Sequence, residues 1–299
     1  AGLLMKTDAE MILYDGNTNL TAEAIQAKLP EKKDIQIIIG NLSDEVIRTL
    51  DIAVLSPGVP TDAEFVKRMR AAGVLIWGEL ELADQFARGT VLAITGTNGK
   101  TTTKDMISSV LKRKYRVCHT KKNFNNEIGL SQTLLSLTSE DEVCVTEMGM
   151  RGLGQIEELC HVACPTIGVV TNVGTSHIGI LGSRENIARA KGELIEALPE
   201  TGTAILNADD DFVCQMADHF GGKSLFYGIH RGRDVWVDAI EAQPDAMNFH
   251  MQALGECASI PLPMLGIHNV YDALAAATAG RLLDISADEI SKVLAEFVP

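Results

Sequence analysis

The chain has 299 residues, of which 46% are hydrophobic, 22% charged and 5% aromatic, and its formal net charge is −14. The apolar content excludes disorder as the main state, and the length suggests about two domains. The apolar runs are too short for a membrane span, and the first residues lack the pattern of a signal peptide. The acidic net charge argues against a nucleic-acid-binding surface. An anionic ligand would therefore need a local cation, a helix terminus or a metal ion.

Short apolar runs alternate with amphipathic stretches in the first part of the chain. Strands are predicted at Glu10–Tyr14, Ile35–Gly40, Asp51–Leu55 and Val74–Trp77, and helices at Thr21–Leu29, Asp44–Leu50 and Asp62–Ala72. This order is typical of an α/β fold with a largely parallel sheet. The chain opens part-way through a βα unit, so we expect an incomplete Rossmann-like domain over residues 1–88 whose first strand is missing.

A helix predicted at Glu79–Ala87 ends at Arg88-Gly89, where we place the boundary to a second domain, 89–299. Strands are predicted there at Thr90–Thr95, Val143–Glu147, Thr166–Thr171 and Thr203–Leu206, and helices near Thr102–Lys114, Asn186–Leu198 and Asn269–Leu283. The shorter alternating runs between Lys223 and Pro263 favour an antiparallel patch. Because the chain closes directly after a helix, we expect it to be a fragment of a longer protein.

The strongest local motif is an apolar strand followed by a glycine-rich turn and Lys-Thr. The candidate phosphate-binding residues are Gly96, Thr97, Asn98, Gly99, Lys100, Thr101 and Thr102. Backbone N–H groups at a helix start form a cradle for anions, Lys100 would neutralise phosphate charge and the Thr101 hydroxyl would reach Mg²⁺. The spacing G-x-x-G-K-[ST] is tighter than the common phosphate loop. The alternative is an ordinary glycine turn before a helix.

Two further side chains stand where strands end. Glu147 ends the run VCVTE and His177 follows the run IGVVTNV. Carboxyl ends of parallel strands gather ligands, so both are candidate Mg²⁺ contacts, although each alone could be an ordinary strand-end or loop residue. The six cysteines (Cys118, Cys144, Cys160, Cys164, Cys214, Cys257) are too sparse for a disulfide scaffold, so we expect reduced thiols and a cytoplasmic protein.

Six ordered segments carry a family resemblance: TGTNGKTTT, KNFNNEIGL, VTEMGMRGLGQIEEL, VVTNVGTSHIGILGSRENIARAKGE, LNADDD and GIHNVYDALAAATA. Residues 89–299 resemble the central ATPase domain of the Mur ligases, which are cytoplasmic ATP-dependent amide ligases of peptidoglycan, and thus cell-wall, synthesis. NFNNEIG, EMGM and LGSRENIARAKGE are most similar to the branch that adds D-Ala-D-Ala to UDP-MurNAc-tripeptide. LYD, VLSPGVP and WGELEL in the first 88 residues instead resemble the UDP-sugar-binding domain of the branch that adds D-glutamate to UDP-MurNAc-L-Ala.

The resemblance assigns catalytic roles to Lys100, Glu147, His177 and Lys191. Lys100 and its loop would hold ATP phosphates, Thr101 and Glu147 would bind one Mg²⁺, and His177 would contact a second metal. In the motif Ala190-Lys191-Gly192-Glu193 the family lysine is usually carbamylated, which turns Lys191 into an anionic metal ligand. Its alternative is a solvated helix lysine.

Other residues are assigned to binding. The resemblance places His268 and Asn269 on the adenine side, together with Asp272, where the family commonly has Asn; the alternative is a polar helix start. Asn123 and Asn126 would lie beside metal and substrate. In the first domain, Asp15 and the turn Ser56-Pro57-Gly58 would bind the uridine or pyrophosphate, and otherwise the turn is an ordinary strand-to-helix connection.

The implied reaction forms an acyl phosphate from a substrate carboxylate and ATP, which an amine then attacks. The partners would be a UDP-MurNAc-peptide and an amino acid or dipeptide. We expect the protein to be a monomer that binds no nucleic acid and has no membrane span. We expect that these 299 residues do not include the family's C-terminal ligase domain, and hence weak or no ligation by these residues alone. Alternatives are D-glutamate addition, a non-catalytic nucleotide- or UDP-sugar-binding module, and a ligase similar to folylpolyglutamate synthase.

Overall fold

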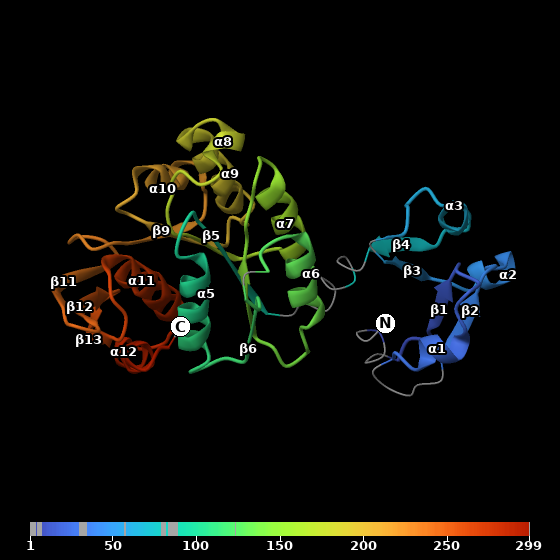
Figure 1. Ribbon diagram of the computed structural model, residues 1–299, viewed down its shortest axis with the longest axis horizontal. Coiled ribbons are helices and arrows are strands. Elements are labelled where there is room, and N and C mark those ends of the chain that lie inside the picture. The colour runs from blue at the N-terminus through green and yellow to red at the C-terminus, as the bar shows by residue number, and fades with distance from the viewer. Residues whose placement is uncertain are drawn as a thin grey trace. The chain divides into compact units, whose positions relative to one another are not determined.

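A computed structural model of the chain describes residues 4, 8–29, 35–56, 58–78, 82, 89–122 and 124–298. The chain divides into two compact units, residues 1–85 and 86–299 (Figure 1). The helix predicted at Glu79–Ala87 lies outside the described residues, apart from Leu82. Each unit has its own core.

The first unit contains two pairs of parallel strands. Strand β1 (Ile12–Asp15) pairs with β2 (Gln36–Ile39), and β3 (Ile52–Leu55) pairs with β4 (Leu75–Gly78). The helices are α1 (Ala22–Gln26), α2 (Asp44–Ile47) and α3 (Glu64–Ala71). Both strand pairs contribute to one small core around Leu42, Ile47 and Met69. The predicted strands and helices of this unit are therefore confirmed, with small shifts at their ends.

The second unit is built on a nine-stranded sheet in the order β13-β12-β11-β10-β9-β8-β5-β7-β6. Its strands are β5 (Thr90–Thr95), β6 (Val117–His119), β7 (Val143–Glu147), β8 (Ile167–Val170), β9 (Thr203–Asn207), β10 (Lys223–Tyr227), β11 (Val235–Ala242), β12 (Met247–Ala253) and β13 (Glu256–Leu262). Only β11, β12 and β13 pair in antiparallel fashion among the described strands. The prediction of an antiparallel patch between Lys223 and Pro263 is confirmed for β11, β12 and β13. It is wrong for β10, which pairs in parallel with β9 and β11.

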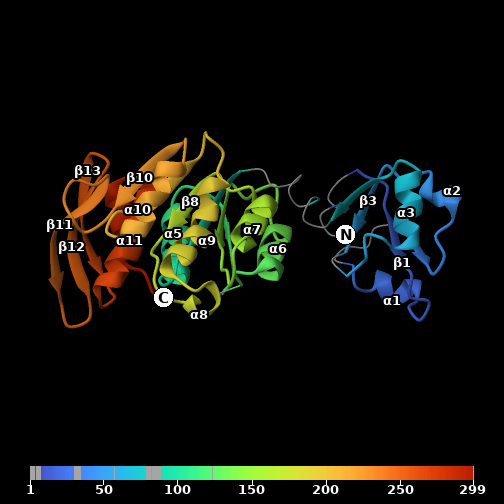
Figure 2. The same cartoon turned by 90° about the horizontal axis from the view of Figure 1, so that it is seen from above.

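Helices cover both faces of this sheet (Figure 2). They are α5 (Lys100–Leu111), α6 (Glu127–Leu135), α7 (Gln155–Ala163), α8 (Ile178–Leu181), α9 (Arg184–Glu196), α10 (Asp211–Gln215), α11 (Ile267–Leu282) and α12 (Ala287–Ala295). On β8, Val169 belongs to the core shared with α5 and α11, whereas a Cβ at Gly168 would meet Leu194 and Ile195 of α9. Neighbouring residues of a strand face opposite sides, so α5 and α11 cover one face and α9 the other.

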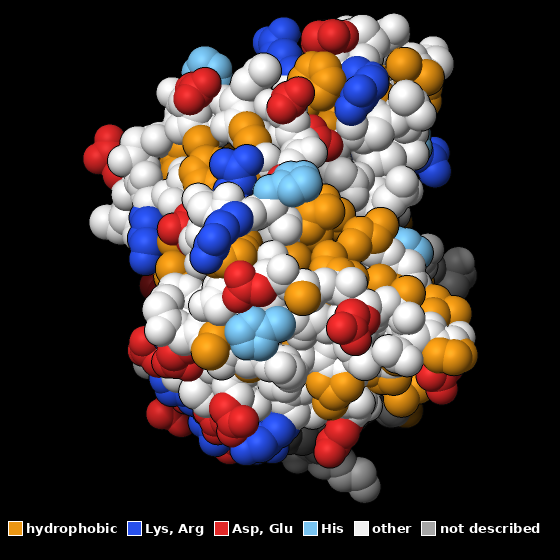
Figure 3. Space-filling model, turned by 90° about the vertical axis from the view of Figure 1, so that its left-hand side faces the viewer, with side chains coloured by type: hydrophobic (Ala, Val, Ile, Leu, Met, Phe, Trp, Pro, Cys, Tyr) orange, Lys and Arg blue, Asp and Glu red, His pale blue; other side chains and the backbone are white. Residues whose placement is uncertain are grey.

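Charged side chains of both signs are spread over the surface of the second unit (Figure 3). On the face drawn in Figure 3 the Lys and Arg side chains are scattered among Asp and Glu rather than gathered into one field. Among the helices that the structure describes, none combines the length and the apolar composition needed to cross a membrane.

Candidate nucleotide-binding site

The carboxyl ends of β5, β7 and β8 meet at one edge of the sheet, where the chain order reverses on either side of β5. The glycine-rich loop follows β5, Glu147 ends β7, and the segment Thr171–His177 follows β8. Crevices at such reversal points are the usual ligand sites of open parallel sheets. The topology thus brings the predicted loop and the predicted acidic residue together.

The loop after β5 opens helix α5. Gly99, just before the helix, has a left-handed backbone with φ 80°, which glycine adopts without steric cost. The first backbone bond into α5 runs from the N–H of Thr103 to the carbonyl of Gly99. Among the described residues, the N–H groups of residues 100–102 have no acceptor. Three free N–H groups at a helix start form the anion cradle that the motif predicts.

The segment after β8 holds this loop in shape. The backbone N–H of Asn98 donates to Asn172 Oδ1 at 3.0 Å, and Thr171 Oγ1 donates to the carbonyl of Asn98 at 2.8 Å. A Cβ at Gly96 would lie 1.8 Å from Thr171 Oγ1, so a side chain there would displace the brace. Thr171 and Asn172 were not singled out from the sequence, because their contact partners are more than 70 residues away.

Two lysines near the loop affect each other electrostatically. Lys100 Nζ donates to the carbonyls of Gly96 and Thr97, and burial lowers the pKa of Lys100 while Glu147 raises it. Lys191 on α9 is only 4% exposed, and burial, with a smaller effect of Lys100, lowers its pKa to about 7. Within the described part of the chain, the Lys191 ammonium has no hydrogen-bond or ion-pair partner. The buried Lys191 amine, with the half-buried Lys100 nearby, favours an anionic ligand at this end of the site.

Glu147 is almost fully buried and is held from two sides. Thr101 Oγ1 donates to its Oε2 at 2.8 Å, and Asn125 Nδ2 donates to its Oε1 at 2.8 Å. The Glu147 N–H donates to Thr120 Oγ1 at 3.2 Å, which fixes the backbone as well. Thr101 and Glu147 therefore lie in direct contact, and the carboxylate retains free lone pairs for a cation, while their shared Mg²⁺ stays a prediction.

The loop that carries Asn125 is anchored to α5 by a buried lysine. Lys104, 1% exposed, donates from Nζ to the carbonyl of Lys122 at 2.8 Å and lies 3.1 Å from Asp105 Oδ1. Farther along the loop, the carbonyl of Asn125 accepts from Gly149 N–H at 2.8 Å. These anchors explain how Asn125 reaches Glu147.

The structure distributes the asparagines of NFNNEIG differently from our expectation. Asn126 is the N-cap of α6, where its Oδ1 accepts from the N–H of Gly129 at 3.0 Å. The amide that reaches the acidic site is its neighbour Asn125, which sequence reasoning missed, and Asn123 lies outside the described residues. A run of three nearly adjacent asparagines signals the loop but does not say which one caps the helix.

His177 lies exposed in the loop after β8, directly before α8, with a left-handed backbone at φ 63°. It is on the expected side of the sheet. Among the described contacts, its side chain touches neither Thr101 nor Glu147. A second metal contact by His177 stays a prediction.

Glu193, the last residue of the AKGE motif, caps a neighbouring helix. Its carboxylate accepts from the N–H groups of Gly154, Ile156 and Glu157 at 2.6, 3.1 and 3.2 Å. The carboxylate therefore serves as the acceptor for the start of α7, where an acidic group is also favoured by the helix dipole. Because Glu193 and Lys191 belong to the same helix, this cap fixes the orientation of α9 that buries Lys191.

We expect Glu193→Gln to lower the free energy of unfolding by about 1–3 kcal/mol. The amide keeps one acceptor oxygen but places an NH₂ group against backbone N–H donors. Urea unfolding measures the loss, and Glu196→Gln, an exposed change on the same helix, serves as the control. Equal midpoints for the two variants would contradict the capping role.

The start of α11 carries the residues predicted for the adenine side. His268 is exposed, and the buried Asn269 donates from Nδ2 to the carbonyl of Leu265 at 2.7 Å. Asp272 lies deeper, 5% exposed, and accepts from Thr103 Oγ1 at 2.7 Å. A Cβ at Gly99 would come within 2.4 Å of its Oδ1, so Asp272 supports the phosphate loop from below.

In the first unit, Asp15 ends β1 and accepts from the N–H of Asn17 at 2.8 Å. The turn after β3 is closed by the N–H of Val59, which donates to the carbonyl of Ser56 at 2.9 Å. A Cβ at Gly58 would meet nothing within 4 Å, so this position borders open space. Pro57 lies outside the described residues.

The donor set at the sheet edge fits Mg²⁺ shared with phosphate oxygens. Hydroxyl and carboxylate oxygens of Thr101 and Glu147 are hard ligands, and Mg²⁺ commonly takes one or two carboxylates, with phosphates and waters completing its octahedron. Nowhere in the described ranges do three or more His, Cys, Asp or Glu side chains form a metal-binding group. The oxygens of Thr101 and Glu147 fit Mg²⁺ whose remaining ligands are phosphate oxygens and waters.

The parallel sheet, the glycine loop at its reversal point and the adjacent Lys, Thr and Glu define a phosphate-loop α/β domain. Comparison with known families gives the finer assignment. The family model described as Mur ligase middle domain matches residues 94–280. The chain belongs to the Mur ligase family.

Individual relatives agree with this assignment. The chain is 40% identical, over 70% of its length, to the UDP-N-acetylmuramoyl-tripeptide--D-alanyl-D-alanine ligase of Synechocystis sp., of which it covers 44%. It is 31% identical, over 99% of its length, to the UDP-N-acetylmuramoylalanine--D-glutamate ligase of Lachnoclostridium phytofermentans, of which it covers 63%. The crystal structure of MurF ligase from Thermotoga maritima in complex with ADP superposes with TM-score 0.68 at 26% identity, covering 87% of this chain and 66% of that one. The chain thus spans less than two thirds of the length of either curated relative.

Proposed function

We propose that the chain is the nucleotide-binding and catalytic core of an ATP-dependent amide ligase that adds D-Ala-D-Ala to UDP-MurNAc-tripeptide in cytoplasmic peptidoglycan synthesis. The observation that carries the proposal is the Thr101–Glu147 pair beside the N–H cradle, with the half-buried Lys100 and the buried Lys191 near it. The choice of D-Ala-D-Ala is supported by the 40% identity to a relative of that name. Residues 89–299 would form this core, and residues 1–88 would bind the UDP-sugar.

The nucleotide would lie with its phosphates on the loop Gly96–Thr102. The ADP complex of the Thermotoga maritima relative supports a nucleotide in this fold. The free N–H groups of residues 100–102 would bind phosphate oxygens, and Lys100 would exchange its bonds to loop carbonyls for bonds to phosphate. His268 and Asn269, at the start of α11, would lie on the base side.

Thr101 and Glu147 would hold one Mg²⁺, His177 would contact a second metal, and a carbamate on Lys191 would be a further metal ligand. Bound Mg²⁺ offsets the repulsion between the phosphate and the attacking carboxylate. A carbamate forms only on an unprotonated amine. Burial lowers the pKa of Lys191 to about 7, so a large share of the amine is unprotonated near neutral pH.

The reaction has two bond exchanges. A substrate carboxylate oxygen bonds to the γ-phosphorus while the bond from that phosphorus to ADP breaks, and Lys100 balances the growing charge. The amine of the acceptor then attacks the acyl carbon, loses a proton and expels phosphate. The chain's main contribution is to position the phosphates and to exclude water, which supplies much of the rate in such transfers.

D-glutamate addition to UDP-MurNAc-L-Ala is the second candidate. The observation that favours it is the relative of that name in Lachnoclostridium phytofermentans, whose similarity extends over 99% of the chain and so includes the first unit. Its uridine contacts would come from Asp15, Ser56, Pro57 and Gly58.

Phosphate release from ATP with matched substrate pairs separates the two candidates. The gene product that contains this chain would be given UDP-MurNAc-tripeptide with D-Ala-D-Ala, or UDP-MurNAc-L-Ala with D-glutamate. We expect release with the first pair only. Release with the second pair only would assign D-glutamate addition, and silence with both would contradict a ligase and leave a nucleotide-binding module.

A further inference from the structure

Two cysteines occupy neighbouring positions on adjacent parallel strands. Cys118 of β6 and Cys144 of β7 are direct partners in the register of the sheet. Adjacent strands lie about 4.7–4.9 Å apart, and paired residues point to the same face. That spacing falls within the range of Cα separations that a disulfide bridges, about 4.4–6.8 Å.

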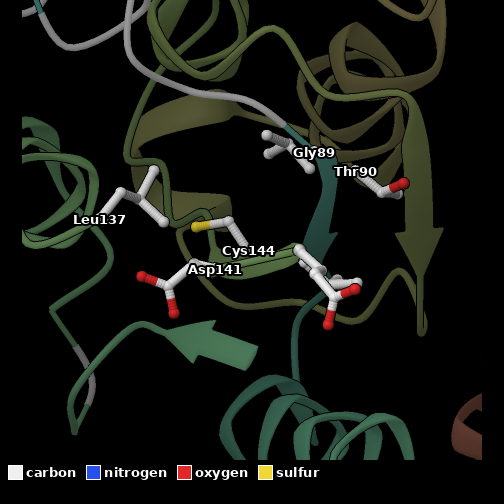
Figure 4. A pocket seen from close by; sticks show the side chains of 8 residues that line it. Gly89, Thr90, Leu137, Asp141 and Cys144 are labelled. Carbon is white, nitrogen blue, oxygen red and sulfur yellow. The ribbon is translucent and has the colours of Figure 1, made fainter. Parts of the chain in front are cut away.

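The two thiols differ in their surroundings. Cys118 is half-buried, with Sγ 3.5 Å from Ser136 Oγ and 3.9 Å from the carbonyl of Thr133. Cys144 is buried and lines a hollow of about 10 Å³, together with Gly89, Leu137 and Asp141 (Figure 4). This hollow holds about one water molecule and lies at the amino ends of β5 and β7, away from the phosphate loop.

The proximity of the two thiols makes them chemically unequal. The neighbouring Cys144 side chain lowers the pKa of Cys118 to about 6, whereas Cys118 and burial raise the pKa of Cys144. The thiolate is the reactive form of cysteine. The pair thus combines a half-buried nucleophile, Cys118, with a buried, protonated thiol on the next strand.

We propose that Cys118 and Cys144 form a peroxide-responsive thiol–disulfide pair. The Cys118 thiolate attacks one oxygen of hydrogen peroxide, so that an S–O bond forms, the O–O bond breaks and hydroxide leaves. The Cys144 sulfur then attacks the Cys118 sulfur, the S–S bond forms, the S–O bond breaks, and the departing hydroxide takes the Cys144 proton as water. Two thiols lose two electrons, and the peroxide is reduced to water.

The strand geometry favours reversal of this bond. Disulfides prefer Cβ atoms about 3.5–4.5 Å apart, closer than side chains on neighbouring strands naturally stand. A bridge here therefore pulls β6 towards β7 and is strained, and strained bridges are the more easily reduced ones. A small dithiol such as dithiothreitol returns both cysteines to thiols.

The test treats the reduced chain with one equivalent of hydrogen peroxide, followed by alkylation and peptide mapping without reductant. We expect a Cys118–Cys144 cross-linked peptide within a monomer that dithiothreitol removes. Cys144→Ser should instead accumulate a sulfenic acid on Cys118, which dimedone traps, and Cys118→Ser should give neither product. Cys257→Ser, at an exposed thiol on β13, should leave the cross-link unchanged.

Reaction rates give a second readout in the unmodified sequence. We expect Cys118 to react with an alkylating reagent at pH 7 about tenfold faster than Cys257, despite its lower exposure. The proposal is overturned if Cys118 reacts no faster than Cys257. The proposal is also overturned if peroxide cross-links separate chains through exposed cysteines while Cys118 and Cys144 stay reduced.

Discussion

Glu147→Gln should reduce phosphate release from ATP by about 10²–10³-fold, equivalent to about 3–4 kcal/mol of transition-state stabilisation. The carboxylate is the acidic group that contacts Thr101, and its other oxygen accepts from Asn125. Replacing one oxygen by an NH₂ group removes the negative charge and turns a donor towards Asn125 or Thr101. Both changes weaken a site for Mg²⁺ while leaving the phosphate loop intact.

A binding measurement separates loss of the metal site from misfolding. We expect Glu147→Gln to bind a fluorescent ADP analogue as well as the unmodified protein in EDTA but to lose the increase in affinity that Mg²⁺ provides. Glu140→Gln, an exposed change shortly before β7, should behave as the unmodified protein in both conditions. Undiminished phosphate release by Glu147→Gln would remove Glu147 from the proposed catalytic site.

The parts of this site that the sequence predicts are those made by contiguous residues. Strand β5, the loop Gly96–Thr101 and the start of α5 follow one another directly, and strand, glycine turn and Lys-Thr each have a local signature. Glu147 was found because a buried strand ends at it, and the parallel sheet brings strand ends to one edge.

Residues whose roles depend on tertiary contacts could not be assigned in this way. Asn125 and Asn126 have the same side chain, and only the direction of the loop, fixed in part by Lys104, decides which caps α6 and which reaches Glu147. In the sequence, Glu193 is only the last residue of the motif around Lys191. In the structure its carboxylate accepts hydrogen bonds from the start of α7, the helix that follows β7. Its partners lie more than 35 residues away in the sequence.

Asp272 shows how burial changes the meaning of a substitution. From the sequence it was expected to contact adenine in place of the asparagine common in the family. In the structure its carboxyl is buried beneath Gly99 and accepts from Thr103 Oγ1. Burial raises the pKa of Asp272 to about 7, against the opposing effect of the Thr103 hydrogen bond. A buried carboxylate so close to the phosphate loop weakens the fold whenever it is ionised.

Asp272→Asn should therefore raise the free energy of unfolding at pH 8 by about 2–4 kcal/mol and leave it nearly unchanged at pH 4. Between about pH 4 and pH 7 the native carboxyl holds a proton that the unfolded chain has lost, so stability falls as pH rises through this window. An asparagine does not titrate, and its Oδ1 can accept the same hydrogen bond from Thr103. The gain should thus grow from pH 4 to pH 7 and then level off.

Urea unfolding at several pH values, followed by Trp236 fluorescence in a Trp77→Phe background, reports the second unit alone, because these are the two tryptophans of the chain. Asp245→Asn, at an exposed position, should shift the midpoint by no more than about 0.5 kcal/mol at any pH. A loss of stability in Asp272→Asn at pH 8 would mean that the ionised carboxylate is favoured by its surroundings. Asp272 would then hold the loop as an anion that accepts from Thr103, and the asparagine common in the family could not replace it.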